Sequence, residues 1–207
     1  MAEPLGMFPL QTVLFPGAVI RLHVFEPRYQ ALMAECRRGD GSFGVVLISR
    51  GSEVGGGDQR VDLGTVARLA RVGELGEGRL LVDAVGGERV RVLEWLPDDP
   101  YPRATVEVVP DEDPTADPEE LERARVAVAR LRSLLSELRD IAPLAHDLSL
   151  EGDPDRVGWQ LCALAPLGAL DRQALLAIGG TGERMALLTS QCDAMATDVT
   201  ALLAGGT

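Results

Sequence analysis

The sequence predicts an α+β protein with a β-rich first half and a helical second half. Short β-type runs separated by glycine-rich turns fill the chain up to about residue 110. An acidic, proline-rich stretch follows, and two long apolar stripes with helical spacing come after it. With 207 residues, 46% of them hydrophobic, the chain is long enough to bury a core. We therefore predict a β domain at 1–110, an acidic Pro-rich linker at 111–117 and a helical bundle at 118–207.

The first half contains several short runs with strand character. These runs are residues 43–50, 61–72, 79–85, 88–95 and 104–109. Glycine-rich segments that favour turns separate them, at 39–41, 55–58, 76–78 and 86–87. Strands at such short spacing are typical of a barrel or a sandwich. Residues 63–81 are expected to form a hairpin that turns at 76–78.

The stretch FEPRY, Phe25 to Tyr29, predicts a corner between a strand and a helix. In residues 18–25, apolar side chains at every second position alternate with a mixed set of apolar and polar ones, which indicates a strand with one buried face. Pro27 suits the first helical position, and Glu26 is the N-cap candidate. Tyr29 then leads an apolar face that continues through Leu32, Met33 and Cys36. We interpret Glu26, Pro27, Arg28 and Tyr29 as a structural motif, with a catalytic Glu26 and Arg28 pair as the alternative.

The second half carries the signals of a helical bundle. Asp117, Pro118 and Glu120 form an N-terminal capping box pattern. Apolar residues then recur at spacings of three and four. The first stripe is Leu121, Ala124, Val128, Leu131, Leu135 and Leu138, and the second is Met185, Leu188, Cys192, Met195, Val199 and Leu202. Between the stripes, Asp153 and Pro154 should open a helix that Pro166 closes, and Asp171 should cap a shorter one.

Charge and composition exclude several functions. The net charge is −12, and all 20 basic residues are arginine because the sequence has no lysine. A P-loop lysine, a Ser-Lys dyad and a Schiff-base lysine are therefore ruled out. The acidic surface disfavours nucleic acid as a partner. The chain shows neither a signal peptide nor a membrane-spanning run, so a cytoplasmic protein without membrane contact is expected.

No pattern predicts a metal or a cofactor. The two histidines, His23 and His146, lie far apart in the sequence, and the three cysteines form no CxxC pair. Cys36 lies on the predicted apolar face, where thiols are usually inert. The glycine-rich loop at 51–60 fits neither GxGxxG nor a P-loop. We predict that neither catalytic residues nor cofactor-binding residues are present.

Six motifs together resemble the amino-terminal substrate-binding domain of Lon protease. They are MFPLQTVLFPG (7–17), LHVFEPRY (22–29), FGVVLI (43–48), EVGG (53–56), LGTVARL (63–69) and PYPRATVE (100–107). The resemblance continues more weakly through residues 166–188. It implies a PUA-like β-barrel domain followed by a helical bundle, without the ATPase and protease modules. It also implies a non-enzymatic module that binds unfolded or damaged polypeptide, with a protease as a further partner.

Aromatic residues beside prolines predict where polypeptide would dock. Phe15, Trp95 with Leu96, and Tyr101 each lie next to or near a proline, which stiffens the backbone around them. Stiff aromatic side chains are frequent among residues that dominate interface energy. The alternative is that these rings plug the ends of the barrel. Two other functions stay open at this point: an RNA-binding PUA-like protein, and a small hydrolase built on Cys36 or on the Glu26 and Arg28 pair.

Overall fold

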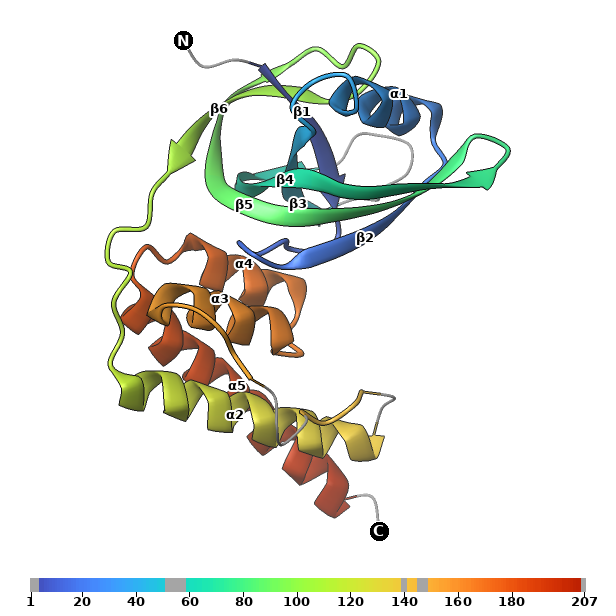
Figure 1. Ribbon diagram of the computed structural model, residues 1–207. Coiled ribbons are helices and arrows are strands. Elements are labelled where there is room, and N and C mark those ends of the chain that lie inside the picture. The colour runs from blue at the N-terminus through green and yellow to red at the C-terminus, as the bar shows by residue number, and fades with distance from the viewer. Residues whose placement is uncertain (1–3, 51–58, 139–140, 145–148, 206–207) are drawn as a thin grey trace. The chain divides into compact units, whose positions relative to one another are not determined.

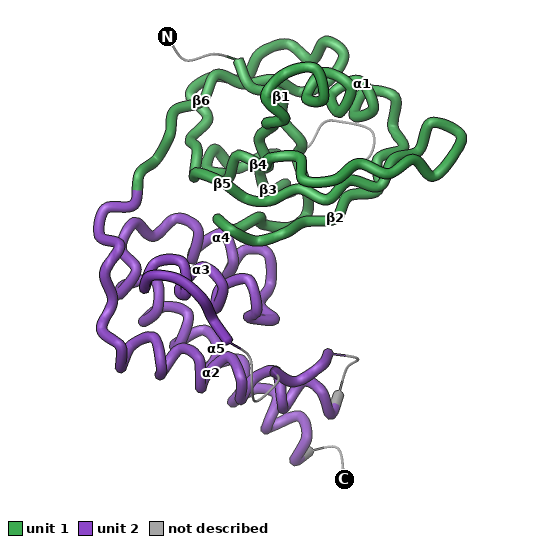
Figure 2. Tube along the Cα trace, viewed as in Figure 1, with its two compact units in different colours: residues 1–110 green, residues 111–207 purple. Residues whose placement is uncertain are grey.

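The computed structural model divides the chain into two compact units (Figure 2). The first unit is residues 1–110 and the second is residues 111–207. The structure describes residues 4–50, 59–138, 141–144 and 149–205. Within these residues, none of the helices is both long enough and apolar enough to cross a bilayer.

A mixed six-stranded sheet and one helix make up the first unit (Figure 1). Its elements are β1 (Pro4–Leu10), β2 (Val19–Val24), α1 (Pro27–Cys36), β3 (Ser42–Arg50), β4 (Gln59–Gly76), β5 (Arg79–Leu96) and β6 (Arg103–Val109). The strand order is β2-β5-β4-β3-β1-β6, and β6 also pairs with β5. Five strands therefore close into a barrel, while β2 pairs with β5 alone. The predicted α+β class with a barrel-type β domain is confirmed.

The β4–β5 hairpin agrees with the prediction at its turn and differs from it further along. Gly76, Glu77 and Gly78 all have positive φ, at 84°, 52° and 74°, so the turn lies where the glycines placed it. The expected second turn at Gly86 and Gly87 is wrong, because both residues lie inside β5. A Cβ atom on Gly86 would lie 2.1 Å from the carbonyl oxygen of Phe15. This glycine therefore permits a close backbone approach rather than a turn.

Helix α1 covers part of the barrel with the face that the sequence predicts. Tyr29, Leu32, Met33 and Cys36 are all buried. The ring of Tyr29 stacks on Phe8 with centroids 4.0 Å apart and planes 10° from parallel. Burying a large apolar side chain contributes about 1.5–3 kcal/mol, so these four residues anchor the helix to the barrel.

Four helices make up the second unit. They are α2 (Pro118–Leu138), α3 (Pro154–Leu164), α4 (Ala169–Ala177) and α5 (Thr181–Gly205). The predicted capping box is present: Asp117 Oδ1 accepts from the Glu119 N–H at 2.8 Å, and Glu120 Oε2 accepts from the Asp117 N–H at 3.2 Å. Asp153 caps α3 in the same way, by accepting from the Arg156 N–H at 2.9 Å. The expected cap at Asp171 is wrong, because Gly168 is the N-cap of α4 and Asp171 lies in the first turn.

The apolar stripes of α2 and α5 are buried over most of their length. Their buried members are Ala124, Val128, Leu131 and Leu135 on α2, and Met185, Leu188, Cys192 and Val199 on α5. The last position of the second stripe is wrong, since Leu202 is 69% exposed. Spacing identifies the apolar face of a helix but not how far along that face its neighbours reach.

A buried arginine joins three parts of the second unit. The side chain of Arg184 is fully buried and donates to Asp155 Oδ1 at 2.9 Å and to Asp111 Oδ1 at 3.3 Å. Its guanidinium carbon lies 3.3 Å from the ring centroid of Trp159. Asp155 also accepts from Thr181 Oγ1 at 2.7 Å and from Trp159 Nε1 at 3.0 Å. The network therefore links the start of α3, the start of α5 and the segment after Pro110.

The segment 111–117, expected to be a linker, is hydrogen-bonded within the second unit. The carbonyl of Asp113 accepts from the Thr181 N–H at 2.8 Å, and the Glu112 N–H donates to the Gly179 carbonyl at 3.2 Å. Asp113 also forms an isolated parallel bridge with Gly180. These bonds, together with the ion pair of Asp111, hold the acidic segment against the start of α5.

Candidate functional site

Strand β2 has one edge that no other described strand covers. It pairs antiparallel with β5 from Val19↔Val85 to Val24↔Leu80, and with no other strand. The Gly86 N–H donates to the Ala18 carbonyl at 2.8 Å, which sets the alternation of the ladder. The Ala18 carbonyl and both backbone groups of Ile20, Leu22 and Val24 thus face β5. Those of Val19, Arg21 and His23 face the open edge.

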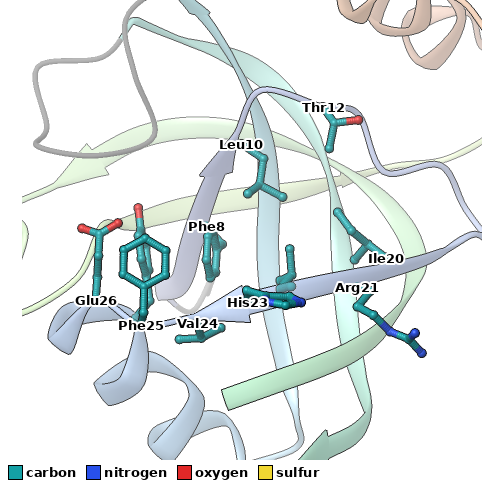
Figure 3. A pocket seen from close by; sticks show the side chains of 11 residues that line it. Phe8, Leu10, Thr12, Ile20, Arg21, His23, Val24, Phe25 and Glu26 are labelled. Carbon is teal, nitrogen blue, oxygen red and sulfur yellow. The ribbon is translucent and has the colours of Figure 1, made fainter. Parts of the chain in front are cut away.

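A groove of about 430 Å³ lies between β1, β2 and the start of α1 (Figure 3). We call it the β1–β2 groove. The apolar part of its lining comes from Phe8, Leu10, Ile20, Leu22, Val24 and Tyr29. Polar groups line it at Thr12, Arg21, His23 and Glu26. A concave, mostly apolar site with few polar groups is typical of a binding site.

Two exposed apolar side chains flank β2. Val19, the first residue of the strand, is 68% exposed, and Phe25, which follows its last residue, is 57% exposed. Phe25 also lines the β1–β2 groove (Figure 3). The open strand edge is thus bounded by an apolar side chain at each end.

The cation beside the groove is engaged within the protein. Arg21 donates through Nε and a terminal nitrogen to the two carboxylate oxygens of Asp83, at 2.6 and 3.0 Å. The hydrogen bond to Asp83 raises the pKa of Arg21 above its usual value. The same bond lowers the pKa of Asp83. Because Asp83 lies on β5, this two-pronged pair fastens β2 to its neighbour and neutralises the arginine.

The FEPRY corner forms one end of the groove. Helix α1 begins at Pro27 and Glu26 occupies the N-cap position, but the Glu26 side chain makes no capping hydrogen bond. Its carboxylate accepts instead from Arg28 Nε at 3.0 Å, with both side chains about one-fifth exposed. The Arg28 guanidinium lies 4.6 Å from the centre of the Tyr29 ring. The expected side-chain cap is therefore wrong, and a packed Glu26–Arg28–Tyr29 stack takes its place.

The aromatic residues that the sequence assigned to polypeptide docking are divided by the structure. Phe15 is 0% and Tyr101 4% exposed, so both rings belong to the core and present no surface to a partner. The Tyr101 hydroxyl donates to Glu35, and burial together with this bond raises its pKa to about 12. Trp95 and Leu96 are half-buried at the end of β5, where the Arg60 guanidinium lies 4.5 Å from the Trp95 ring centre. A binding role for Trp95 and Leu96 stays a prediction.

The thiols lack the environment of nucleophiles. Burial raises the pKa of Cys36 to about 11 and those of Cys162 and Cys192 to about 12. The Cys36 thiol donates to the Ser42 carbonyl at 3.3 Å. Reactive cysteines show the opposite shift, because the thiolate is the attacking species. The described residues therefore offer no activated thiol for the hydrolase alternative.

Two features that the sequence analysis weighed fall outside the described residues. His146 lies there, as does most of the glycine-rich loop at 51–60. Over the ranges that the structure does describe, no three His, Cys, Asp or Glu residues come together in a way that could hold a metal ion.

Comparison with known proteins assigns the chain to a family. Residues 4–192 match the ATP-dependent protease La (LON) substrate-binding domain. The chain belongs to this family. A Lon N-terminal domain protein from Xanthomonas campestris has a crystal structure that superposes with a TM-score of 0.67 at 30% identity, covering 91% of this chain and 98% of that one. The N-terminal domain of a Mycobacterium avium complex Lon protease shares the fold, with a TM-score of 0.61 at 17% identity over 92% of this chain and 98% of that one.

Curated relatives of this Lon-family chain are much longer proteins. Lon protease 2 of Myxococcus xanthus is 29% identical over 190 residues, which are 90% of this chain and 23% of that protein. The Lon protease of Anaeromyxobacter dehalogenans is 32% identical over 143 residues, 68% of this chain and 17% of that protein. The chain therefore spans less than a quarter of the length of these relatives.

The groove itself was not predicted from the sequence. Two signals were present: the alternation that placed β2, and the FEPRY motif that turned out to form one end. Neither signal reveals that β2 has a free edge, because that depends on which distant strands pair.

Proposed function

We propose that this chain is a non-enzymatic polypeptide-binding module that takes apolar segments of unfolded protein into the β1–β2 groove. The groove combines an apolar lining, an exposed phenylalanine at its end and a neighbouring strand edge. These are the features that an unfolded chain, rich in exposed apolar side chains and unpaired backbone groups, would engage. The family description, a substrate-binding domain of a protease, supports the same class of ligand.

The groove carries this proposal. A volume of about 430 Å³ has room for a few side chains of an extended segment. Its one arginine is neutralised by Asp83, so acidic ligands gain little there. A net charge of −12 further disfavours the phosphate backbone of RNA. A protease remains the natural second partner, since the named relatives are Lon proteases.

The test is a fluorescence anisotropy titration of a labelled model protein kept unfolded by reduction and alkylation. Phe25→Ala should weaken binding by about five- to thirtyfold, as expected for loss of an aromatic anchor worth about 1–2 kcal/mol. The matched control is Leu93→Ala, since Leu93 on β5 is similarly exposed, at 55%, and does not line the groove. Thermal melts should show both variants folded. Equal affinities for the two variants would place the binding surface elsewhere.

A further inference from the structure

We propose that the bound polypeptide adds to the open edge of β2 as an extra strand, with alternate side chains inserted into the β1–β2 groove. This inference rests on the proposed function and specifies its ligand: an extended segment of about six residues, free of proline, with apolar side chains at every second position.

The backbone of β2 offers a complete pattern of hydrogen bonds on its open side. The Ala18 carbonyl is bonded to Gly86, and the register between β2 and β5 has no shift as far as the pair Val24↔Leu80. The backbone groups that point away from β5 therefore belong to Val19, Arg21 and His23. Each presents one N–H donor and one C=O acceptor away from β5. The same pattern on an incoming strand would satisfy all of them, whereas a small molecule or a helix would not.

The side chains of β2 show where those of an added strand would go. Ile20, Leu22 and Val24 point inward and line the groove. Neighbouring strands place their side chains on the same two faces, so every second side chain of the ligand would lie beside these residues. The other side chains would lie on the opposite face, beside the exposed side chains of Arg21 and His23 at the rim of the groove, where polar residues are tolerated.

The length of the ligand segment follows from the ends of β2. The strand has six residues, which span about 20 Å at the usual rise of a strand. The exposed Val19 and Phe25 lie at its two ends, where they would contact the first and last residues of the added strand. A segment of about six residues therefore fills both the edge and the groove.

Backbone N-methylation tests strand addition without changing any side chain. The probe is a fluorescein-labelled synthetic peptide of alternating valine and threonine, flanked by serine and glycine, in three forms: unmodified, methylated on the valine nitrogens, and methylated on the threonine nitrogens. Only one set of N–H groups would face β2. One methylated form should therefore lose at least about tenfold in affinity, and the other should stay within about threefold of the unmodified peptide.

The outcomes separate this inference from the proposed function. If the unmodified peptide binds and the two methylated forms have the same affinity as each other, strand addition is wrong while polypeptide binding stands. If neither this peptide nor the unfolded model protein binds, the proposed function itself fails and the inference fails with it.

The protein side offers a matched pair of variants. His23→Pro removes one N–H that points away from β5. The pairing of β2 with β5 should be kept, because proline is tolerated where the N–H lies on the free side of an edge strand. His23→Ala removes the imidazole but keeps the N–H. We expect His23→Pro to bind the unmodified peptide about tenfold more weakly than His23→Ala does, because only the proline removes the N–H. Equal affinities of the two folded variants would overturn the inference. The inference would also be overturned if the protein forms a dimer that His23→Pro dissociates but the peptide does not. The edge of β2 would then bind a second copy of the chain.

Discussion

Removing the carboxylate of Asp155 should destabilise the second unit more than any single surface substitution. Asp155 is the nearer of the two carboxylates bonded to Arg184, whose side chain is fully buried. Asp155→Ala would leave that guanidinium with the Asp111 carboxylate at 3.3 Å and the Ile178 carbonyl at 3.4 Å. It would also remove the partner of Thr181 Oγ1 and of Trp159 Nε1. Breaking a buried ion pair from one side costs about 3–5 kcal/mol. That is a large part of the 5–15 kcal/mol typical of whole domains.

A second substitution distinguishes the buried charge from lost packing. If most of the cost of Asp155→Ala comes from the uncompensated guanidinium, then adding Arg184→Met should recover about 1–2 kcal/mol, because methionine replaces the charge with apolar volume. Arg184→Met alone should cost less than Asp155→Ala, since Asp155 is 19% exposed and keeps two other hydrogen bonds.

The assay is urea unfolding followed by far-ultraviolet circular dichroism, which is dominated by the helices of the second unit. The control is Arg123→Ala, which breaks an exposed pair with Glu119 and should cost under about 0.5 kcal/mol. A loss below about 1 kcal/mol for Asp155→Ala, or a double variant whose loss is the plain sum of the two single losses, would refute the reasoning.

Tyr29→Ala should cost about 3–5 kcal/mol in urea unfolding, because it opens a cavity beside Phe8. Glu26→Ala should cost under about 1 kcal/mol, because its carboxylate caps no backbone N–H, and a larger loss would contradict this view of the corner. Cys36, with a pKa of about 11, and Cys162, with a pKa of about 12, should react with a disulfide reagent at pH 8 only after unfolding; rapid labelling of the native protein would disprove their burial. The pKa values of both thiols in the folded protein exceed the ordinary 9.0, so the stability that the neutral thiols contribute should be full below pH 9 and should be lost as the pH rises to about 12. This loss of stability with pH should be less steep in Cys162→Ala. The chain has no lysine, and calorimetry should detect no binding of ATP at micromolar concentrations.

Local signals in the sequence predicted local structure well. The capping box at Asp117 and Glu120 and the cap at Asp153 were predicted because a helix start depends on residues within one turn. The buried face of α1 followed from spacing alone. In each case the residues that decide the structure are neighbours in the chain.

The misses share a different cause, since each depends on a distant segment. Gly86 was expected in a turn because two adjacent glycines usually mark one, yet the carbonyl of Phe15 occupies the space a side chain would need. Phe15 and Tyr101 were grouped with the docking residues because prolines adjoin them, with burial of the rings as the alternative, and the structure buries both rings. The β1–β2 groove likewise arises from pairing choices, β1 with β3 and β2 with β5, that no short window of sequence contains.

The open edge of β2 exposes the protein to unspecific association unless a ligand pairs with it. Exposed strand edges promote uncontrolled association, and proteins usually protect them with lysines, prolines or closure into a barrel. In this unit the barrel closes through five strands and leaves β2 outside the closure. The edge carries no lysine, its arginine is tied to Asp83, and exposed apolar side chains mark both of its ends. A net charge of −12 would repel other copies of the chain at long range without covering the edge. Long-range repulsion of other acidic copies, combined with a strand edge that no described strand pairs with, would favour a neutral, extended ligand over self-association, which is the physical case for the proposed strand addition at this site.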